Sequence, residues 1–241
     1  MDENNLKNLA VIPARGGSKR LKKKNIAQLN GKPLISYTIE SAIQSRCFKQ
    51  IIFSSDDRKI LDIAKNYSQI TAEKRPKKFS GDKVKVIELI LSILNRDNLK
   101  NQFDTITLLL PTCPLRRVSD IKNGFKLLSR KIDSVVSITE FEFPVRMGIE
   151  YKKQSKILKY LFAPSPLVTG NTRSQDHKPI FRPNGAFYIS WWNKLQTNKN
   201  YFSGKVKGHV MPREHSVDID NQTDLRYAEM LLKQNYIKLD Y

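Results

Sequence analysis

Short apolar runs alternate with stretches of helical periodicity along most of this chain. Leu9–Pro13 is an uninterrupted apolar run, which is typical of a strand buried on both faces. Lys59–Tyr67 instead places its apolar residues on one face of a helix. The two patterns predict strands at Leu9–Pro13, Gln50–Ser55, Ile70–Thr71, Thr105–Leu110, Ser134–Ile138, Ala186–Ser190 and His209–Met211, and helices at Leu34–Ile43, Lys59–Tyr67, Val84–Leu94, Ile121–Leu128, Trp191–Leu195 and Thr223–Gln234.

This alternation is typical of a mostly parallel sheet with helices on both faces, a Rossmann-like three-layer α/β fold. The 241 residues fit one domain, 1–241. The rhythm breaks between Phe143 and His177, where short β-like pieces, prolines and lysines alternate. We interpret residues 143–177 as an excursion from the main sheet. Ligands of such sheets bind beyond the carboxyl ends of the strands, so the chemistry is expected there.

Composition narrows the class of protein. The chain has no apolar run near the roughly 20 residues of a membrane span, and Met1–Asn8 lacks the apolar core of a signal peptide. Cys47 and Cys113 form neither a disulfide framework nor a metal knuckle. We therefore expect a cytoplasmic protein that does not associate with membranes.

The net charge of +20, from 43 basic and 23 acidic residues, has two interpretations. It can reflect a polyanionic partner such as nucleic acid, or simply a lysine-rich surface. The basic residues spread along the whole chain, apart from a cluster at Lys19–Lys24, and no zinc-finger spacing or RNA-binding aromatic motif accompanies them. We therefore expect no nucleic-acid partner.

The segment after the first strand has the composition of a phosphate-binding loop. Residues 13–20 read Pro-Ala-Arg-Gly-Gly-Ser-Lys-Arg, so that two glycines allow a tight turn with N–H groups aimed at an anion. Arg15 can hold a phosphate through two parallel bonds, Lys19 and Lys24 supply point charges, and Asn25 adds a donor. The loop is neither a Walker loop nor a dinucleotide motif. The alternative is a basic surface turn.

Other strand ends carry further polar candidates. Residues 110–116 form a proline-framed loop whose hydroxyl and Arg116 can hold a base or ribose; the alternative is a connector with Arg116 in solvent. Arg182 and Asn184 suit the carboxylate or hydroxyls of a sugar, although Asn184 also begins a turn-like pair with glycine. Arg75, after the third strand, can reach a phosphate or a base.

Two aspartates stand out in this basic chain. If their segment is extended, Asp218 and Asp220 point to the same face. Two close carboxylates repel unless a cation intervenes, and Mg²⁺ bridging carboxylates and phosphates meets that need. The alternative is that Asp220 or Asn221 caps the last helix. Helix capping is also the simplest role for Asp57 and Asp82, which precede earlier helices.

The order and spacing of these features are specific from about Leu9 to Leu232. The chain resembles the acylneuraminate cytidylyltransferase family, the CMP-sialic acid synthetases, in residues 12–20, 111–116, 182–185 and 218–220. The resemblance implies a Rossmann-like nucleotidyltransferase fold and a Mg²⁺-dependent reaction, in which CTP and a nine-carbon α-keto acid sugar give the CMP-sugar and pyrophosphate. It also implies a homodimer formed through the 143–177 excursion.

The resemblance further implies a role for each candidate residue. The expected catalytic residues are Arg15, Lys24 and Asp220. The nucleotide would be bound by Ala14, Arg15, Gly16, Gly17, Ser18, Lys19, Lys24, Asn25 and Arg75, the sugar by Leu110, Gln175, Arg182 and Asn184, and the metal by Asp218 and Asp220. No histidine is placed as a base, so we expect His177, His209 and His215 to be structural or surface groups.

The chain departs from the family's pattern on the sugar side. Leu110 replaces a usual glutamine, Cys113 a serine, and Ser174 the second arginine of an Arg-Arg-Gln segment. The acceptor therefore stays open among sialic, legionaminic and pseudaminic acids. Three alternatives also remain: another sugar nucleotidyltransferase such as a CMP-Kdo synthetase, a non-catalytic nucleic-acid-binding protein, and a family member that binds nucleotide without turnover.

Overall fold

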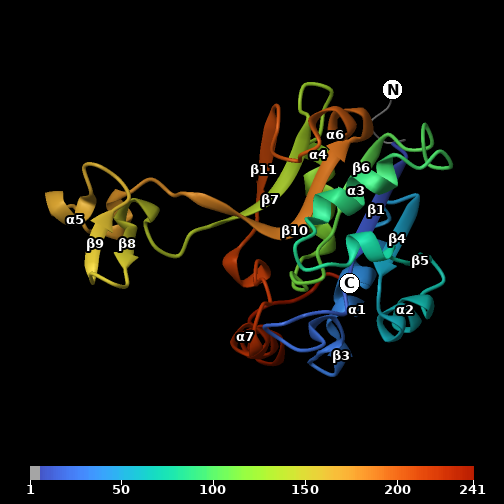
Figure 1. Ribbon diagram of the computed structural model, residues 1–241, viewed down its shortest axis with the longest axis horizontal. Coiled ribbons are helices and arrows are strands. Elements are labelled where there is room, and N and C mark those ends of the chain that lie inside the picture. Colours follow the sequence, from blue (N-terminus) through green and yellow to red (C-terminus); the bar gives the residue numbers. More distant parts are fainter. Residues whose placement is uncertain (1–5) are drawn as a thin grey trace. The chain divides into compact units, whose positions relative to one another are not determined.

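A computed structural model describes residues 6–241 of the chain (Figure 1). Its contacts divide the chain into two compact units. The first unit comprises the described part of Met1–Ile138 together with Pro183–Tyr241, and the second is Thr139–Arg182. The predicted 143–177 excursion falls inside the second unit. No helix in residues 6–241 is long and apolar enough to cross a membrane.

The first unit is built on a seven-stranded sheet with the order β11-β7-β10-β6-β1-β4-β5. The pairs β1–β4, β1–β6, β4–β5 and β7–β11 are parallel, whereas β10 runs antiparallel to β6. The sheet is therefore mostly parallel, as predicted. The strands are β1 (Asn8–Pro13), β4 (Gln50–Ser55), β5 (Ile70–Lys74), β6 (Thr105–Leu108), β7 (Ser134–Glu140), β10 (Phe181–Trp191) and β11 (Val206–Val210).

Helices cover both faces of this sheet (Figure 1). Along β1, Ala10 and Ile12 belong to a core cluster shared with α1 and α2, whereas Leu9 and Val11 belong to a second cluster shared with α3 and α6. Because side chains alternate along a strand, β1 buries both faces, which explains its uninterrupted apolar run. The helices are α1 (Leu34–Ser45), α2 (Arg58–Lys65), α3 (Val86–Leu94), α4 (Val118–Leu127), α6 (Trp192–Asn198) and α7 (Gln222–Lys233).

The predicted elements are present, with differences at their ends. β10 continues through Pro183-Asn184-Gly185, which the sequence suggests as a turn, and Gly185 has the left-handed φ of 81°. β11 begins at Val206 and ends at Val210, whereas the predicted strand began only at His209. The prediction missed the first residues because Lys207 and Gly208 on this edge strand interrupt the apolar pattern. Two short strands were not predicted, β2 (Gln28–Leu29) and β3 (Lys32–Pro33), which flank the Gly31 turn.

The second unit contains an antiparallel hairpin of β8 (Ile149–Lys152) and β9 (Ile157–Tyr160), followed by the short helix α5 (Pro166–Thr169). All eight residues of the two strands are exposed. The ends of the unit meet, because the Phe141 N–H donates to the Ile180 carbonyl at 2.9 Å. The strands are short and uncovered, which explains why no regular pattern was visible in the sequence.

Candidate active site

A cavity of about 530 Å³ lies in the first unit, where several parallel strands end. Its lining brings together the loop after β1, Arg75 after β5, the loop after β6 and the segment before α7. This is the carboxyl edge of the sheet, where the fold predicts a ligand. Eight predicted site residues line the cavity: Arg15, Ser18, Lys19, Lys24, Asn25, Arg75, Leu110 and Asp220.

The glycines after β1 have different roles in shaping the loop. The Gly16 N–H donates to Asp56 Oδ1 at 2.8 Å, and a Cβ on Gly16 would lie 2.8 Å from the Cβ of Asp57. Only glycine therefore fits at position 16 without displacing the start of α2. Gly17 has open space around its Cα, and Ala14 is fully buried in the core. Ala14 and Gly16 thus shape the loop rather than line the cavity.

Asp82 pairs with two cations of the loop. Arg15 Nη1 lies 2.9 Å and Lys19 Nζ 2.6 Å from its carboxylate oxygens. The hydrogen bond and charge of Lys19, with a smaller contribution from Arg15, lower the pKa of Asp82. The predicted capping role of Asp82 is wrong, because α3 begins at Val86 and its N-cap is Lys85. Sequence reasoning missed this contact, which joins residues far apart in the chain.

Asp220 lines the cavity and contacts two cations of the segment after β1. Its two oxygens each lie 2.9 Å from a cation, Oδ1 from Lys24 Nζ and Oδ2 from Arg20 Nη1. Lys24 is mostly buried, whereas Arg20 is largely exposed and was not among the predicted residues. The alternative role, capping of α7, belongs to Asn221, whose side chain accepts from two backbone N–H groups of that helix. Asp220 is therefore available to the cavity.

Burial alternates along the segment that carries both aspartates. Val217 and Ile219 are buried, whereas Asp218 is exposed and Asp220 half-buried, as expected for an extended segment with two carboxylates on one side. Burial, and then the charge of Asp218, raise the pKa of Tyr188 to about 12. Within residues 6–241 no group of three or more His, Cys, Asp or Glu residues could hold a metal. Two carboxylates still match Mg²⁺ sites that are completed by substrate phosphates.

Asn25 and Arg75 connect the cavity to the backbone beneath it. Asn25 is buried and donates from Nδ2 to the Arg15 carbonyl at 2.7 Å, which holds the loop closed. Arg75 donates from Nη2 to the Ser54 carbonyl at 2.8 Å, while its buried Nε has no partner among the described residues. Burial lowers the pKa of Arg75, and nearby Asp56 partly offsets this effect.

The loop after β6 contributes Leu110, Pro111 and Thr112 to the cavity wall. Arg116 is neither solvated nor part of that wall: it is completely buried and donates from Nη2 to the Leu110 carbonyl. The expectation failed because the sequence does not reveal that the loop folds over its own arginine. Cys113 is also buried, with its Sγ donating to the His215 carbonyl at 3.7 Å, which gives it a structural role.

The predicted sugar-binding residues fall in both units. Asn184 is buried in the first unit, outside the cavity lining. The neighbouring Gly185 lies against Leu110, whose Cδ1 would be 3.3 Å from a Cβ at Gly185. Gln175 and Arg182 belong to the second unit, where Gln175 lies in an exposed 3-10 turn and Arg182 is half-buried.

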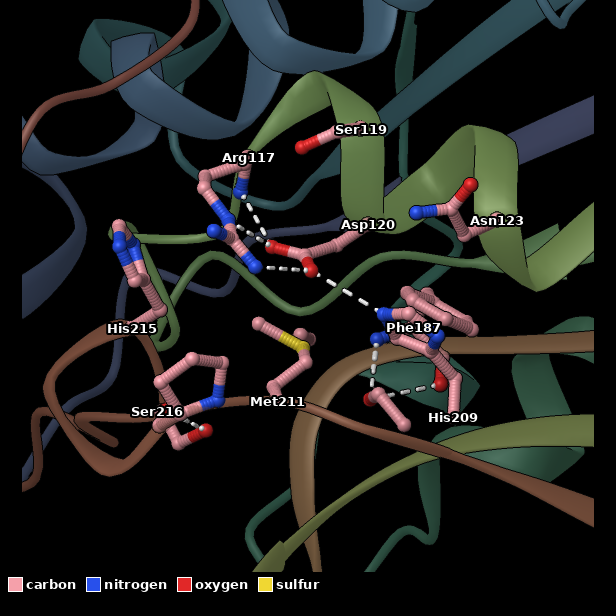
Figure 2. Close-up of polar contacts among 12 residues, drawn as sticks. Arg117, Ser119, Asp120, Asn123, Phe187, His209, Met211, His215 and Ser216 are labelled. Atoms are coloured by element: carbon pink, nitrogen blue, oxygen red, sulfur yellow. Dashed lines mark hydrogen bonds and ion pairs between the residues drawn. The ribbon is translucent and has the colours of Figure 1, made fainter.

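A second polar cluster joins α4 to β11, outside the lining of the cavity (Figure 2). The buried Asp120 accepts from Arg117 Nη2 at 2.9 Å and lies 3.1 Å from His209 Nε2. Burial raises the pKa of Asp120, but the hydrogen bonds from His209 and Arg117 lower it by more than burial raises it. The net pKa of Asp120 is therefore well below the usual range. His209 is thus a structural group, as predicted.

Comparison with known sequences gives one consistent result. The sequence model of the family described as Cytidylyltransferase matches residues 9–239. A pseudaminic acid cytidylyltransferase from Campylobacter jejuni is 32% identical over 96% of this chain and 98% of the relative. A CMP-N,N'-diacetyllegionaminic acid synthase from Legionella pneumophila is 32% identical over 94% and 97%. An N-acylneuraminate cytidylyltransferase from Escherichia coli is 31% identical over 96% of this chain, which corresponds to 54% of the longer relative.

Solved structures agree on the fold. A CMP:2-keto-3-deoxy-manno-octonic acid synthetase complexed with CTP has a TM-score of 0.68 at 16% identity, covering 95% of this chain and 99% of that one. A 4-diphosphocytidyl-2C-methyl-D-erythritol synthase from Anaerococcus prevotii has a TM-score of 0.65 at 14% identity, covering 95% and 99%. The predicted Rossmann-like nucleotidyltransferase architecture is therefore confirmed.

Proposed function

The chain belongs to the cytidylyltransferase family, and on this basis we propose that it transfers CMP from CTP to a nonulosonate, a nine-carbon α-keto acid sugar, with release of pyrophosphate. The observation that carries the proposal is the set of loop cations that lines one cavity together with Asp220. The relatives that are 31–32% identical over the aligned residues are named for nonulosonates. The Kdo enzyme is similar at the level of fold.

On the nucleotide side, the loop cations bind the triphosphate. Arg15 and Lys19 now pair with Asp82, and Lys24 with Asp220. A triphosphate carries more negative charge than one carboxylate, so its oxygens exchange for Asp82 at the first two cations. Held in this way, the departing pyrophosphate is neutralised as the bond from its oxygen to the α-phosphorus breaks.

The anomeric hydroxyl of the sugar forms the new bond to the α-phosphorus. We propose that Asp218 and Asp220 hold Mg²⁺, which matches their oxygen ligands and their shared side of an extended segment. When bound, the ion would neutralise phosphate charge and lower the pKa of the attacking hydroxyl. The work of the protein is then alignment: Lys24 orients Asp220, and Asn25 holds the loop that carries Arg15.

On the acceptor side, we propose that Leu110, in the first unit, contacts the sugar; Gln175 and Arg182, in the second unit, stay predicted sugar ligands. Leu110 supplies an apolar wall to the cavity at the position where the family resemblance has glutamine. An apolar wall favours an acceptor whose facing edge lacks hydroxyl groups, because a buried hydroxyl without a partner is costly. Asn184 was also predicted to bind the sugar, but its side-chain nitrogen already donates to Ser216 and Met211.

We also propose a homodimer formed through the second unit. In the β8–β9 hairpin, Ile149 is opposite Tyr160 and Tyr151 is opposite Leu158. Residues that pair across strands share a face, and so do residues two apart along a strand. These four exposed side chains therefore form one apolar face, which we call the hairpin face. A second copy of the chain covers it.

Because CTP is a cytoplasmic nucleotide, we place the enzyme in the cytoplasm.

The test is pyrophosphate release from CTP and Mg²⁺ with a panel of pseudaminic, legionaminic and N-acetylneuraminic acids and Kdo. We expect turnover with at least one nonulosonate and none when UTP, ATP or GTP replaces CTP. The Asp220→Ala variant should lower turnover at least about 100-fold. Turnover with Kdo alone would overturn the proposed acceptor. Tight, strongly salt-dependent RNA binding without turnover would instead support the nucleic-acid alternative.

A further inference from the structure

The segment that carries both aspartates has little secondary structure of its own. Residues 211–220, the aspartate segment, run from β11 to α7 and contain one short 3-10 turn, Arg213–His215. Near its ends the Met211 N–H donates to the Ile138 carbonyl at 2.8 Å, and the Ile219 N–H donates to the Thr112 carbonyl at 2.7 Å. Between these two points, side-chain contacts hold the segment on two sides. On one side, His215 Nδ1 lies 2.8 Å from the Leu115 carbonyl, and the His215 carbonyl accepts from Cys113 Sγ at 3.7 Å.

Asn184 supplies such contacts from the neighbouring strand β10. Its Nδ2 donates to Ser216 Oγ at 2.8 Å and to Met211 Sδ at 3.2 Å. Its Oδ1 accepts from the Ala186 N–H at 3.1 Å, which fixes the orientation of the amide. Ser216 Oγ in turn donates to the Pro212 carbonyl at 2.8 Å. One amide therefore connects β10 to two points of the aspartate segment.

These contacts leave Asn184 no donor for a substrate. An amide nitrogen has two hydrogens, and here it has two acceptors. The side chain is also buried, with 2% exposed, and it is not among the residues that line the cavity. A direct hydrogen bond to the sugar would require Asn184 to break the contact with Ser216 or Met211.

We propose that Asn184 is a positioning residue that acts through Ser216 to fix the aspartate segment, and thereby the position of Asp220 at the cavity and of Asp218 two residues before it. The catalytic part of this inference rests on the proposed function; the structural part does not. Removal of the amide leaves Ser216 Oγ without its donor in a buried site. The aspartate segment then loses its side-chain connection to β10 and keeps those of His215 to the loop after β6, so it opens more often. The carboxylates then spend less time in the position that the reaction requires.

The first test is hydrogen–deuterium exchange on the protein without nucleotide, sugar or metal. Asn184→Ala and Ser216→Ala should each speed exchange across residues 213–219 about 10-fold, the effect of one lost hydrogen bond on local opening. Asn184→Asp keeps the acceptor for Ala186 but loses the donor, and should do the same. The control is Ser137→Ala: this buried hydroxyl bonds the backbone of Phe187, also on β10, and its loss should leave residues 213–219 unchanged.

The second test is steady-state kinetics with the preferred acceptor. Asn184→Ala should lower kcat about 10- to 100-fold and raise the Mg²⁺ concentration needed for half-maximal rate, with KM for the sugar unchanged within about threefold. Ser216→Ala should reproduce this effect, and the double variant should lose little more than either single variant, since both changes break one connection.

Two results would overturn the inference. One is unchanged exchange over residues 213–219 in variants that melt cooperatively. The other is a higher sugar KM in Asn184→Ala with normal kcat and normal kinetics in Ser216→Ala, which would make Asn184 a direct sugar ligand. If no acceptor supports turnover, the proposed function fails, while the exchange measurement still decides whether Asn184 holds the segment.

Discussion

At the scale of single residues, the groups proposed to bind phosphate already pair with carboxylates of the protein. Asp56 accepts from the Gly16 N–H, Asp82 pairs with Arg15 and Lys19, and Asp220 pairs with Lys24. In the absence of ligand these contacts keep a cluster of like charges from repelling itself. They also mean that a bound triphosphate competes with the protein's own anions.

Removal of Asp82 should therefore strengthen nucleotide binding. Because exposed ion pairs contribute about 0–1 kcal/mol, Asp82→Asn should lower the Kd for CTP by up to about fivefold. Isothermal titration checks the change, with Asp62→Asn as the control, since Asp62 is an exposed carboxylate on α2 that pairs with Lys65. Weaker CTP binding in Asp82→Asn would show that this carboxylate assists the nucleotide instead of competing with it.

The two loop glycines provide a matched pair of substitutions. Gly16→Ala places a methyl group 2.8 Å from the Asp57 Cβ, so we expect a cost of about 1–3 kcal/mol and a displaced loop. Gly17→Ala meets nothing within 4 Å and should be close to neutral. Thermal unfolding and the KM for CTP measure both effects. Equal KM values in the two variants would contradict the role assigned to Gly16.

The positions of the residues that line the cavity are easier to predict from the sequence than the positions of the buried residues beneath it. Arg15, Lys19 and Arg75 follow strands, and the carboxyl ends of parallel strands meet at one edge of a sheet, so their proximity was predictable. The burial of Arg116 and the inward amide of Asn184 depend on how separate segments pack. No local pattern encodes such contacts, because each partner lies elsewhere in the chain.

At the scale of elements, polar contacts join pieces of the fold that have little apolar area in common. The edge strand β11 has exposed residues along much of its length, yet His209 connects it to Asp120 on α4. Asp120 also accepts from the Arg117 N–H, and so serves the first turn of the helix. This cluster (Figure 2) places a buried carboxylate between two donors.

Stability should depend on pH through Asp120. Its pKa is lower in the folded than in the unfolded protein, so it stabilises the fold above its unfolded pKa near 4, and this contribution falls as the pH drops below that value. Asp120→Asn should cost about 3 kcal/mol at neutral pH, and the difference from wild type should shrink below pH about 4. Denaturant unfolding from pH 7 to pH 3 measures it.

The control for this titration is Glu150→Gln, which changes an exposed carboxylate. It should leave the free energy of unfolding unchanged at every pH. A difference between wild type and Asp120→Asn that stays constant down to pH 3 would show that the charge of Asp120 is not what stabilises the cluster.

Among the elements, β1 and β4 were predicted well, because a strand buried on both faces carries a continuous apolar run. β11 and β10 were predicted less well. An edge strand exposes residues such as Lys207, and β10 passes through Asn184-Gly185, a pair that usually marks a turn. The bounds of both strands depend on pairing with neighbouring strands, and a local sequence pattern does not contain that information.

At the scale of the whole molecule, the hairpin face has no cover within its own unit. Leu158 and Tyr151 are each 54% exposed, and a contiguous apolar surface of this kind is typical of an interface. The face was hidden at the sequence level because each strand has only four residues. It became recognisable once the cross-strand partners were known.

The proposed homodimer gives a direct test of that face. Leu158→Glu places a charge among the four apolar side chains and should convert the dimer to a monomer at micromolar concentration. Lys159→Glu, on the opposite face of the same strand, should leave the dimer intact. Sedimentation velocity distinguishes the two states. A Leu158→Glu variant that remains dimeric would exclude the hairpin face as the interface.

The meeting of Phe141 and Ile180 at the base of the second unit has a consequence for protein engineering. In a chimera that exchanges residues 141–180 for the corresponding segment of a relative, both junctions lie one hydrogen bond apart. The segment can therefore be exchanged as a single cassette. The splice leaves the cation loop and the aspartate segment with their native sequence. Exchange of such cassettes between relatives would separate the contribution of the insertion to acceptor preference from that of the cavity wall.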